Sequence, residues 1–297
     1  MIDQLIERIE ALGNPTAVGL DTHFDYLPDA MKQHCHSLAD AAKAITEFNC
    51  LLIDKLSPIV PAVKVQIACY EMYGSAGLQA FADTLAYARS KGLITIADAK
   101  RNDIGSTAAC YSSAFLGKVR VNEAEFTPFC SDFLTVNPYL GIDGIKPFTD
   151  DCRQHKKGIF VLVKTSNPSS AQLQNRKFDD GKTLYETMGD LVETWGADLR
   201  GKYGYSNVGA VVGATHPAEA QTLRKQLPHT FFLIPGYGAQ GGKAADLAVC
   251  FDANKRGGIV NNSRGIICAY KTDKYKGISF ADAAYNAAVD MREDLRL

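Results

Sequence analysis

Runs of consecutive apolar residues recur along the chain and alternate with segments in which apolar residues follow helical spacing. Eight apolar runs are present, at residues 16–20, 59–65, 93–97, 133–136, 159–163, 208–212, 231–234 and 258–260. Segments with helical spacing or strong helix formers lie between them, including residues 39–56, 77–91, 184–203, 218–226 and 242–254. Uninterrupted apolar runs are typical of parallel strands covered by helices, so the pattern predicts β strands alternating with α helices throughout.

This alternation predicts an α/β fold of the (β/α)8 TIM barrel type, with a doubly wound parallel sheet as the alternative. Residues 2–12 place their apolar side chains on one face and predict an extra N-terminal helix that closes the bottom of the barrel. No linker or shift in composition divides the chain, so we expect one domain over residues 1–297. Two polar insertions, at residues 102–131 and 167–182, are expected to extend over the ligand face.

Composition narrows the class of partner. The chain is 46% hydrophobic and 22% charged, with a formal net charge of -1, so it has no overall field for nucleic acid or an anionic membrane. We therefore expect a small-molecule partner. Eight cysteines without a C-x-x-C pair predict reduced, mostly buried thiols. The N-terminus lacks an apolar leader and no run of about 18 apolar residues follows, which indicates a cytoplasmic protein without a membrane span.

Three ionisable residues leave the end of the third apolar run together. Side chains alternate along a strand, so Asp98 and Lys100 must project to the same side, and Asp103 follows after a turn marked by Gly105. Gathering two carboxylates and an ammonium at the edge of a core is costly, because each group loses water there. The segment therefore predicts an active site.

Polar residues also follow the other predicted strands. The carboxyl ends of barrel strands surround a single site, so these residues can share one pocket. They are Asp21, Lys64, Gln66, Asn137, Lys164, Thr165, Ser166, Thr215, Gln240 and Arg264.

A glycine-rich segment follows the seventh strand and satisfies G-x-G-x-x-G at Gly236, Gly238 and Gly241. A dinucleotide role is disfavoured, because the match falls in the seventh of eight units and the nearest acid, Asp252, is only 16 positions beyond Gly236. Loops after strands 7 and 8 commonly form the phosphate site of a barrel, and Arg264 adds a cation there. We therefore predict a phosphate site.

Together these segments resemble the orotidine 5'-phosphate decarboxylase family. The resemblance is carried by Leu20-Asp21, Val63-Lys64-Val65, Asp98-x-Lys100-x-x-Asp103-Ile104, the loop that begins at Pro235, and Arg264-Gly265. The forms of residues 19–25 and 164–168 are similar to the longer bacterial and protist branch. Related barrel enzymes use Asp-x-Lys-x-x-Asp with a metal, so its joint occurrence with Lys64 is the more specific signal.

The resemblance implies decarboxylation of orotidine 5'-phosphate to uridine 5'-phosphate (UMP), without a metal or organic cofactor. Lys100 would stabilise the carbanion at C6 and then protonate it. Asp98 would hold Lys100 protonated and oriented. Lys64 and Asp103 would complete an alternating Lys-Asp-Lys-Asp array in which every charge has opposite neighbours.

The resemblance also implies a homodimer, in which Asp103 and Thr107, with Ile104 beside them, reach the neighbouring subunit's site. The remaining expected substrate contacts are Asp21 to the ribose hydroxyls, Ser166 or Thr165 to the pyrimidine amide edge, Gln66 to ribose or phosphate, Pro235 and Gln240 in the glycine-rich loop, with Gln240 between phosphate and base, and Arg264 with Gly265 to the phosphate. Residues 236–242 are the predicted lid. Lys164 is interpreted as a packing or salt-bridge lysine.

Two other functions are weighed. A metal-dependent sugar-phosphate decarboxylase of the same superfamily would carry the same Asp-x-Lys-x-x-Asp motif, but Lys64 would repel a divalent ion at that strand end. A non-catalytic nucleotide-phosphate sensor would keep the pocket and lose part of the charged array, none of which is missing from this sequence.

Overall fold

The computed structural model describes residues 1–238, 242 and 244–296. Within these residues, eight parallel strands close into a barrel in the order β1-β10-β9-β8-β7-β6-β3-β2. Their bounds are β1 (Thr16–Leu20), β2 (Ala62–Gln66), β3 (Ile94–Arg101), β6 (Phe133–Val136), β7 (Gly158–Lys164), β8 (Val208–Val212), β9 (Phe232–Ile234) and β10 (Gly258–Asn262). The predicted (β/α)8 barrel is confirmed, and the doubly wound sheet is excluded because the sheet closes.

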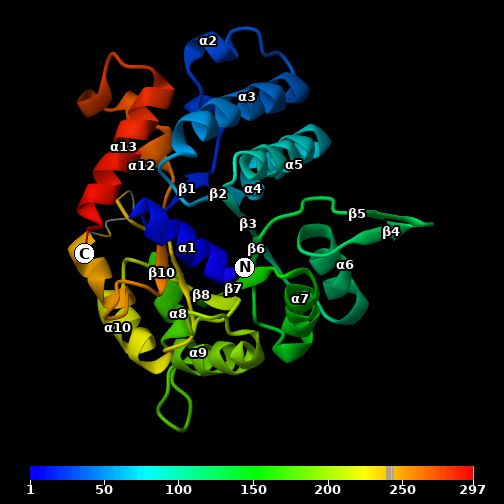
Figure 1. The fold of residues 1–297 in the computed structure, drawn as a ribbon, viewed down its shortest axis with the longest axis vertical. Helices are drawn as coiled ribbons and strands as arrows, with labels where there is room; N and C mark the ends of the chain where they lie inside the picture. Colours follow the sequence, from blue (N-terminus) through cyan, green and yellow to red (C-terminus); the bar gives the residue numbers. More distant parts are fainter. Residues whose placement is uncertain (239–241, 243, 297) are drawn as a thin grey trace.

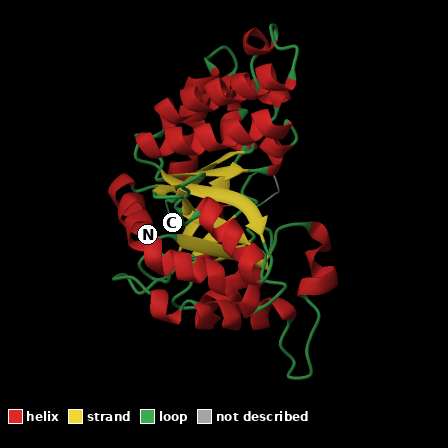
Figure 2. Ribbon diagram, turned by 90° about the vertical axis from the view of Figure 1, so that its right-hand side faces the viewer, coloured by secondary structure: helices red, strands yellow, loops and turns green. Residues whose placement is uncertain are grey.

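Helices surround the barrel, and the strands lie between them in the centre of the molecule (Figures 1 and 2). The longer ones are α3 (Leu38–Leu56), α5 (Gly74–Ser90), α6 (Gly105–Phe115), α7 (Ile142–His155), α9 (Leu184–Trp195), α10 (Pro217–Gln226) and α13 (Phe280–Asp294). Several begin at the side-chain caps expected of helix starts: Ser37 accepts from the Asp40 amide, and Thr183 forms a capping box with Glu186. None of the described helices is long and apolar enough to cross a membrane.

The predicted N-terminal helix is α1 (Ile2–Leu12). Its buried residues Ile2, Leu5 and Ile6 join a core cluster with the inward-facing side chains of the barrel, among them Phe133 and Phe231. In Figure 1 this helix crosses the barrel close to the N-terminus. It therefore covers one end of the barrel with apolar surface, as predicted, and leaves the opposite, carboxyl end for a ligand.

Two predicted helices are shorter than expected. The segment 184–203 ends its helix at Trp195, because Gly196 lies so close to Ser206 that an added Cβ would meet its hydroxyl at 2.5 Å. The segment 242–254 contains only α11 (Ala244–Leu247) and a 3-10 turn at Ala248–Cys250 among its described residues.

The two insertions differ in shape. Residues 102–131 form α6 and a hairpin of β4 (Val119–Val121) and β5 (Ala124–Phe126), which extends away from the barrel in Figure 1. Residues 167–182 form a 3-10 turn (Pro168–Ser170) and α8 (Ala171–Gln174). All eight cysteines are free thiols, as expected, but Cys110 is exposed and only three of the eight are buried. The expectation of mostly buried thiols is therefore wrong.

Candidate active site

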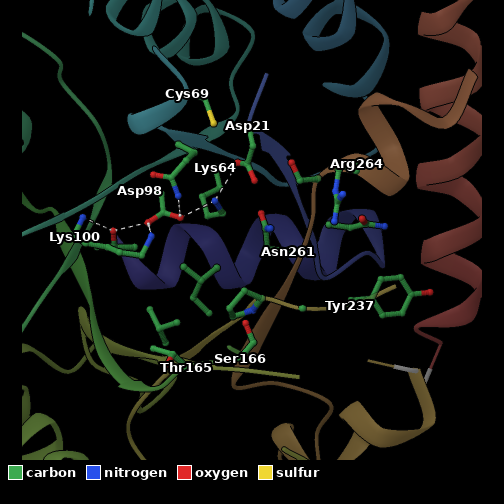
Figure 3. A pocket seen from close by; sticks show the side chains of 18 of the residues that line it. Asp21, Lys64, Cys69, Asp98, Lys100, Thr165, Ser166, Tyr237, Asn261 and Arg264 are labelled. Carbon is green, nitrogen blue, oxygen red and sulfur yellow. Dashed lines mark hydrogen bonds and ion pairs between the residues drawn. The ribbon is translucent and has the colours of Figure 1, made fainter. Parts of the chain in front are cut away.

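A cavity of about 520 Å³ lies at the carboxyl ends of the barrel strands, a volume that suits a small-molecule ligand. It gathers side chains from β2, β3, β6, β7, β8, β9 and β10, and Asp21 from directly after β1, so residues far apart in sequence share one pocket (Figure 3). Nine of the predicted site residues line it: Asp21, Lys64, Gln66, Asp98, Lys100, Thr165, Ser166, Pro235 and Arg264.

Asp98 is the centre of the charged side of the pocket. Its Oδ1 accepts from Lys100 Nζ at 2.6 Å and from Thr135 Oγ1 at 2.8 Å. Its Oδ2 accepts from Lys64 Nζ at 2.7 Å and from Gln66 Nε2 at 3.0 Å. Burial alone would raise the pKa of the Asp98 carboxyl, but Lys64 and Lys100 outweigh it and hold that pKa well below its usual range. Asp98 is therefore a fixed anion with each oxygen bound to one ammonium.

Lys64 is almost fully buried, at 3% exposed, and lies between two carboxylates. Its ammonium is 2.7 Å from Asp98 and 3.4 Å from Asp21. Burial would lower the pKa of Lys64, but the charges of Asp21 and Asp98 raise it above its usual range. Within one chain the alternating array is therefore Asp21, Lys64, Asp98 and Lys100, with the side chain of Lys100 45% exposed at its outer end.

Lys100 has an unusual backbone. Its φ is 48°, in the left-handed region that side chains other than glycine seldom adopt. The pairing of β3 with β6 shifts register between Ala97 and Arg101, and the Lys100 amide donates to the Thr135 hydroxyl at 3.0 Å instead of continuing the ladder. The bulge turns the Lys100 side chain back towards Asp98, so both charges meet at the strand end.

The opposite side of the pocket carries a cation and neutral polar groups. Arg264 begins the short helix α12 (Arg264–Ile267) and forms no ion pair with any described residue. Ser263 before it donates to the Gly19 carbonyl at 2.9 Å, which fixes the loop on β1. Thr165 and Ser166 face Asp98 and Lys100 from across the cavity (Figure 3). An unpaired arginine beside a helix N-terminus can bind a phosphate group.

Asn137, Lys164 and Thr215 follow predicted strands but do not line the cavity of the single chain, and neither do four further described residues of the predicted site. Asp103 instead accepts from the Ile104 amide at 2.8 Å, and Ile104 is 54% exposed. Thr107 is exposed on α6, and Gly265 lies behind Arg264 in the first turn of α12. Gln240 lies outside the described residues, as do residues 239 and 241 of the predicted lid. No residue of the insertion 102–131 lines the described cavity, whereas Asn167 of the second insertion does.

Several lining residues escaped sequence reasoning. Thr135 donates to Asp98 and accepts from the Lys100 amide. It is the single polar residue of an apolar strand, which is the only feature of the sequence that marks it. Asn261 is 7% exposed, lines the cavity at the end of β10, and its Oδ1 has no partner among the described atoms. The remaining ones include His23 and Cys69, which lie 3.5 Å apart. The Gln66 side-chain amide donates to Asp98. The sequence predicted that this side chain contacts ribose or phosphate.

No cluster of three or more His, Cys, Asp or Glu side chains in the described part of the chain is arranged to hold a metal ion. Both oxygens of Asp98 already bind an ammonium group. The site residues therefore suit a reaction in which lysine supplies the positive charge.

Comparison with known proteins identifies the class and the family. A sequence model described as "Orotidine 5'-phosphate decarboxylase / HUMPS family" matches residues 17–275. A curated relative from Caldicellulosiruptor bescii is 44% identical, over 99% of this chain and 97% of its own length. One from Rhodopirellula baltica is 42% identical, over 99% and 98%. Both are named orotidine 5'-phosphate decarboxylase.

Solved structures agree. A putative orotidine 5'-phosphate decarboxylase from Streptomyces avermitilis superposes with a TM-score of 0.78 at 32% identity, covering 99% of this chain and 95% of that one. Fold, charged site and relatives together define a carboxy-lyase built on a (β/α)8 barrel. The chain belongs to the orotidine 5'-phosphate decarboxylase family, which confirms the resemblance seen in its sequence.

Proposed function

We propose that the protein converts orotidine 5'-phosphate to UMP and CO2 through its ion-paired lysines, with no metal or organic cofactor. One observation carries the proposal: the two oxygens of Asp98 each hold one lysine ammonium, and Lys100, the more exposed of the two, borders the cavity. A cation held at this point can meet negative charge as it develops on a substrate carbon.

In the proposed reaction the bond between C6 and the carboxylate carbon breaks, CO2 leaves, and the electron pair stays on C6. Lys100 stabilises that carbanion and transfers a proton to C6, after which the neutral amine regains a proton from solvent. Asp98 keeps Lys100 protonated and oriented at 2.6 Å, while Lys64 keeps Asp98 ionised from the other side. Gln66 and Thr135 occupy the remaining hydrogen-bonding positions of Asp98.

Substrate binding is assigned along the same cavity. Asp21 would accept from the ribose hydroxyls, and Ser166, or Thr165 beside it, would contact the pyrimidine amide edge. Arg264, with the Gly265 amide, would bind the phosphate at the far end, next to Pro235 and Gln240. Phosphate is remote from C6, so its binding energy can serve the transition state only by closing the site and aligning the charges.

We further propose a homodimer in which Asp103, Ile104 and Thr107 enter the partner's pocket. Apolar side chains are exposed on the same part of the chain: Ile104 is 54% exposed, Val121 55% and Phe126 53%. In the hairpin, Val119 pairs with Phe126 and Val121 with Ala124, so one face of β4 and β5 is apolar and uncovered. Such a surface fits burial against a second copy.

The activity is tested by adding orotidine 5'-phosphate to the purified protein with excess chelator and following CO2 release. Release that survives the chelator is expected. Loss of release, restored by a divalent ion, would favour the metal-dependent sugar-phosphate decarboxylase class. No release despite tight UMP binding would instead indicate a nucleotide sensor.

The shared site is tested by complementation. Lys100→Ala and Asp103→Ala proteins should each be nearly inactive alone. After mixing and exchange of subunits, half of the dimers are mixed and each carries one intact site, so activity should return to about a quarter of the wild-type value. Failure to recover activity, with exchange verified by mass, would place Asp103 in its own chain's site.

A further inference from the structure

Lys164, the last residue of β7, is a fully buried lysine that the proposed reaction does not use. Its side chain is 0% exposed and does not line the cavity. No carboxylate of the described residues lies within ion-pair distance of it. Its ammonium donates to Asn175 Oδ1 at 2.8 Å and to Ser170 Oγ at 3.3 Å, and lies 5.5 Å from the centre of the Tyr185 ring. Burial lowers its pKa. A buried cation held only by neutral groups is costly, so a function is to be expected of it.

The partners of Lys164 belong to the insertion at residues 167–182. Ser170 ends its 3-10 turn, and Asn175 directly follows α8. The same segment is tied to the next residue of the strand end, because Gln174 Oε1 accepts from the Thr165 amide at 3.0 Å and Gln174 Nε2 donates to the Thr165 hydroxyl at 2.8 Å. The chain therefore leaves the barrel after Lys164 and is fastened back onto Lys164 and Thr165.

These ties hold the two residues that face the cavity. Thr165 and Ser166 line it directly after Lys164. From the other side, Thr215 donates to the Ser166 carbonyl at 3.1 Å, and an added Cβ on Gly213 would lie 2.8 Å from the Ser166 backbone. Ser166 is thus confined between the end of β8 and the segment that Lys164 anchors.

We propose that Lys164 is a positioning residue, which anchors residues 167–175 and, through the tie to Thr165, holds Ser166 so that its polar groups face the uncharged edge of the pyrimidine. This inference rests on the proposed function, in which Ser166 contacts that edge. An ammonium suits the task, because it has three donors and no acceptor and can bind Ser170 and Asn175 at once. Methionine would fill the same space without binding either of them.

The first test is a double-mutant cycle in the full-length protein, with Lys164→Met, Ser166→Ala and the double variant. Ser166→Ala is expected to raise KM about tenfold and Lys164→Met about fivefold, since each loses a hydrogen-bonded contact. If Lys164 acts through Ser166, the double variant should stay near tenfold. An increase of about fiftyfold, the product of the single effects, would overturn the proposal.

The second test separates positioning from general stability and does not need turnover. Binding of UMP is compared with binding of ribose 5-phosphate, which lacks the base. Lys164→Met should weaken UMP about fivefold and leave ribose 5-phosphate unchanged, because the phosphate and ribose contacts lie elsewhere. Equal weakening of both ligands would overturn the proposal. If the wild-type protein releases no CO2 but Lys164→Met still weakens UMP binding selectively, the result counts against the proposed reaction and not against the role of Lys164.

Lys157 offers a matched control. It is also a buried lysine, 9% exposed, but it bonds to Asp132 at 3.1 Å and does not line the cavity. Lys157→Met should lower stability and leave the ratio of the two affinities unchanged. If Lys164→Met does not fold, Gln174→Ala cuts the tie to Thr165 from the partly exposed side and should produce the same selective loss of UMP affinity. An unchanged ratio in that variant would overturn the proposal equally.

Discussion

The two sides of the pocket bury lysine in opposite ways. On the β1–β3 side, Lys64 is 3% exposed and flanked by two carboxylates, which outweigh burial and raise its pKa. On the β7 side, Lys164 is 0% exposed, has only neutral partners, and its pKa is lowered by burial. The difference teaches that a charged residue at a strand end need not be part of the pocket. What matters is whether the charge belongs to an array that borders the cavity, as Lys64, Asp98 and Lys100 do.

The largest expected effect comes from Lys100, the most exposed residue of the charged array. Lys100→Ala should lower kcat by roughly 10⁴-fold or more, because it removes both the cation and the proton donor at C6. UMP binding should persist through the opposite side. Lys156→Ala is the control, since Lys156 is also left-handed, at φ 55°, and exposed outside the cavity. Steady-state kinetics decides, and near-normal turnover of Lys100→Ala would refute the assignment.

Removing the central anion should have the next largest effect. Asp98→Asn leaves the buried Lys64 with only Asp21, so we expect about 3 kcal/mol of lost stability together with a fall in kcat of roughly 10²-fold or more. Asp132→Asn is matched: Asp132 is also 6% exposed and also holds two cations, Arg89 and Lys157, outside the cavity. It should lose stability and keep its kcat. Urea unfolding measures the loss of stability and steady-state kinetics measures kcat. An equal fall in kcat for both variants would contradict the role assigned to Asp98.

The neutral side should respond more weakly. Ser166→Ala is expected to raise KM about tenfold with little change in kcat, because one neutral hydrogen bond to the base is lost while the charged array is intact. Thr165→Val is the comparison that asks which hydroxyl contacts the substrate. If Thr165→Val raises KM and Ser166→Ala does not, Thr165 is the residue that contacts the base.

The smallest expected effect concerns pH. The pKa of Asp98 is below that of an unfolded aspartate, so its contribution to stability is present above about pH 4 and is lost as the pH falls through the folded pKa. The pKa of Lys64 is raised, so its contribution is present below the ordinary lysine value near 10.4 and is lost only as the pH rises through the folded pKa. The stability difference between wild type and Asp98→Asn should therefore stay constant from about pH 5 to 9. A change near pH 6 or 7 in urea unfolding would show that another group controls the array.

Much of the fold was predictable because each strand is a short apolar run that must be buried on both sides. The spacing of Asp98 and Lys100 predicted a shared direction from regular alternation. The two side chains do meet, but through a bulge at the strand end. The left-handed conformation of Lys100 and the contacts of Thr135 were not predictable, because they depend on the register between β3 and β6. Asn261 gave no signal apart from being polar within a strand.

The membership of the charged array could not be predicted from local sequence. The resemblance placed Asp103 in the array, but within one chain the second carboxylate beside Lys64, after Asp98, is Asp21, which directly follows β1, a strand paired with β2. That contact joins residues 43 positions apart and follows from the register between β1 and β2, which no local pattern contains.

The backbone of Lys100 carries a consequence for how this enzyme tolerates change. In a strand, alanine is normally more stable than glycine, but at φ 48° the order should reverse, because only glycine escapes the left-handed penalty of about 1 kcal/mol. Lys100→Gly should therefore fold more stably than Lys100→Ala, although neither can donate a proton. Selection for thermal stability alone would therefore favour glycine at position 100, where the proposed reaction needs lysine.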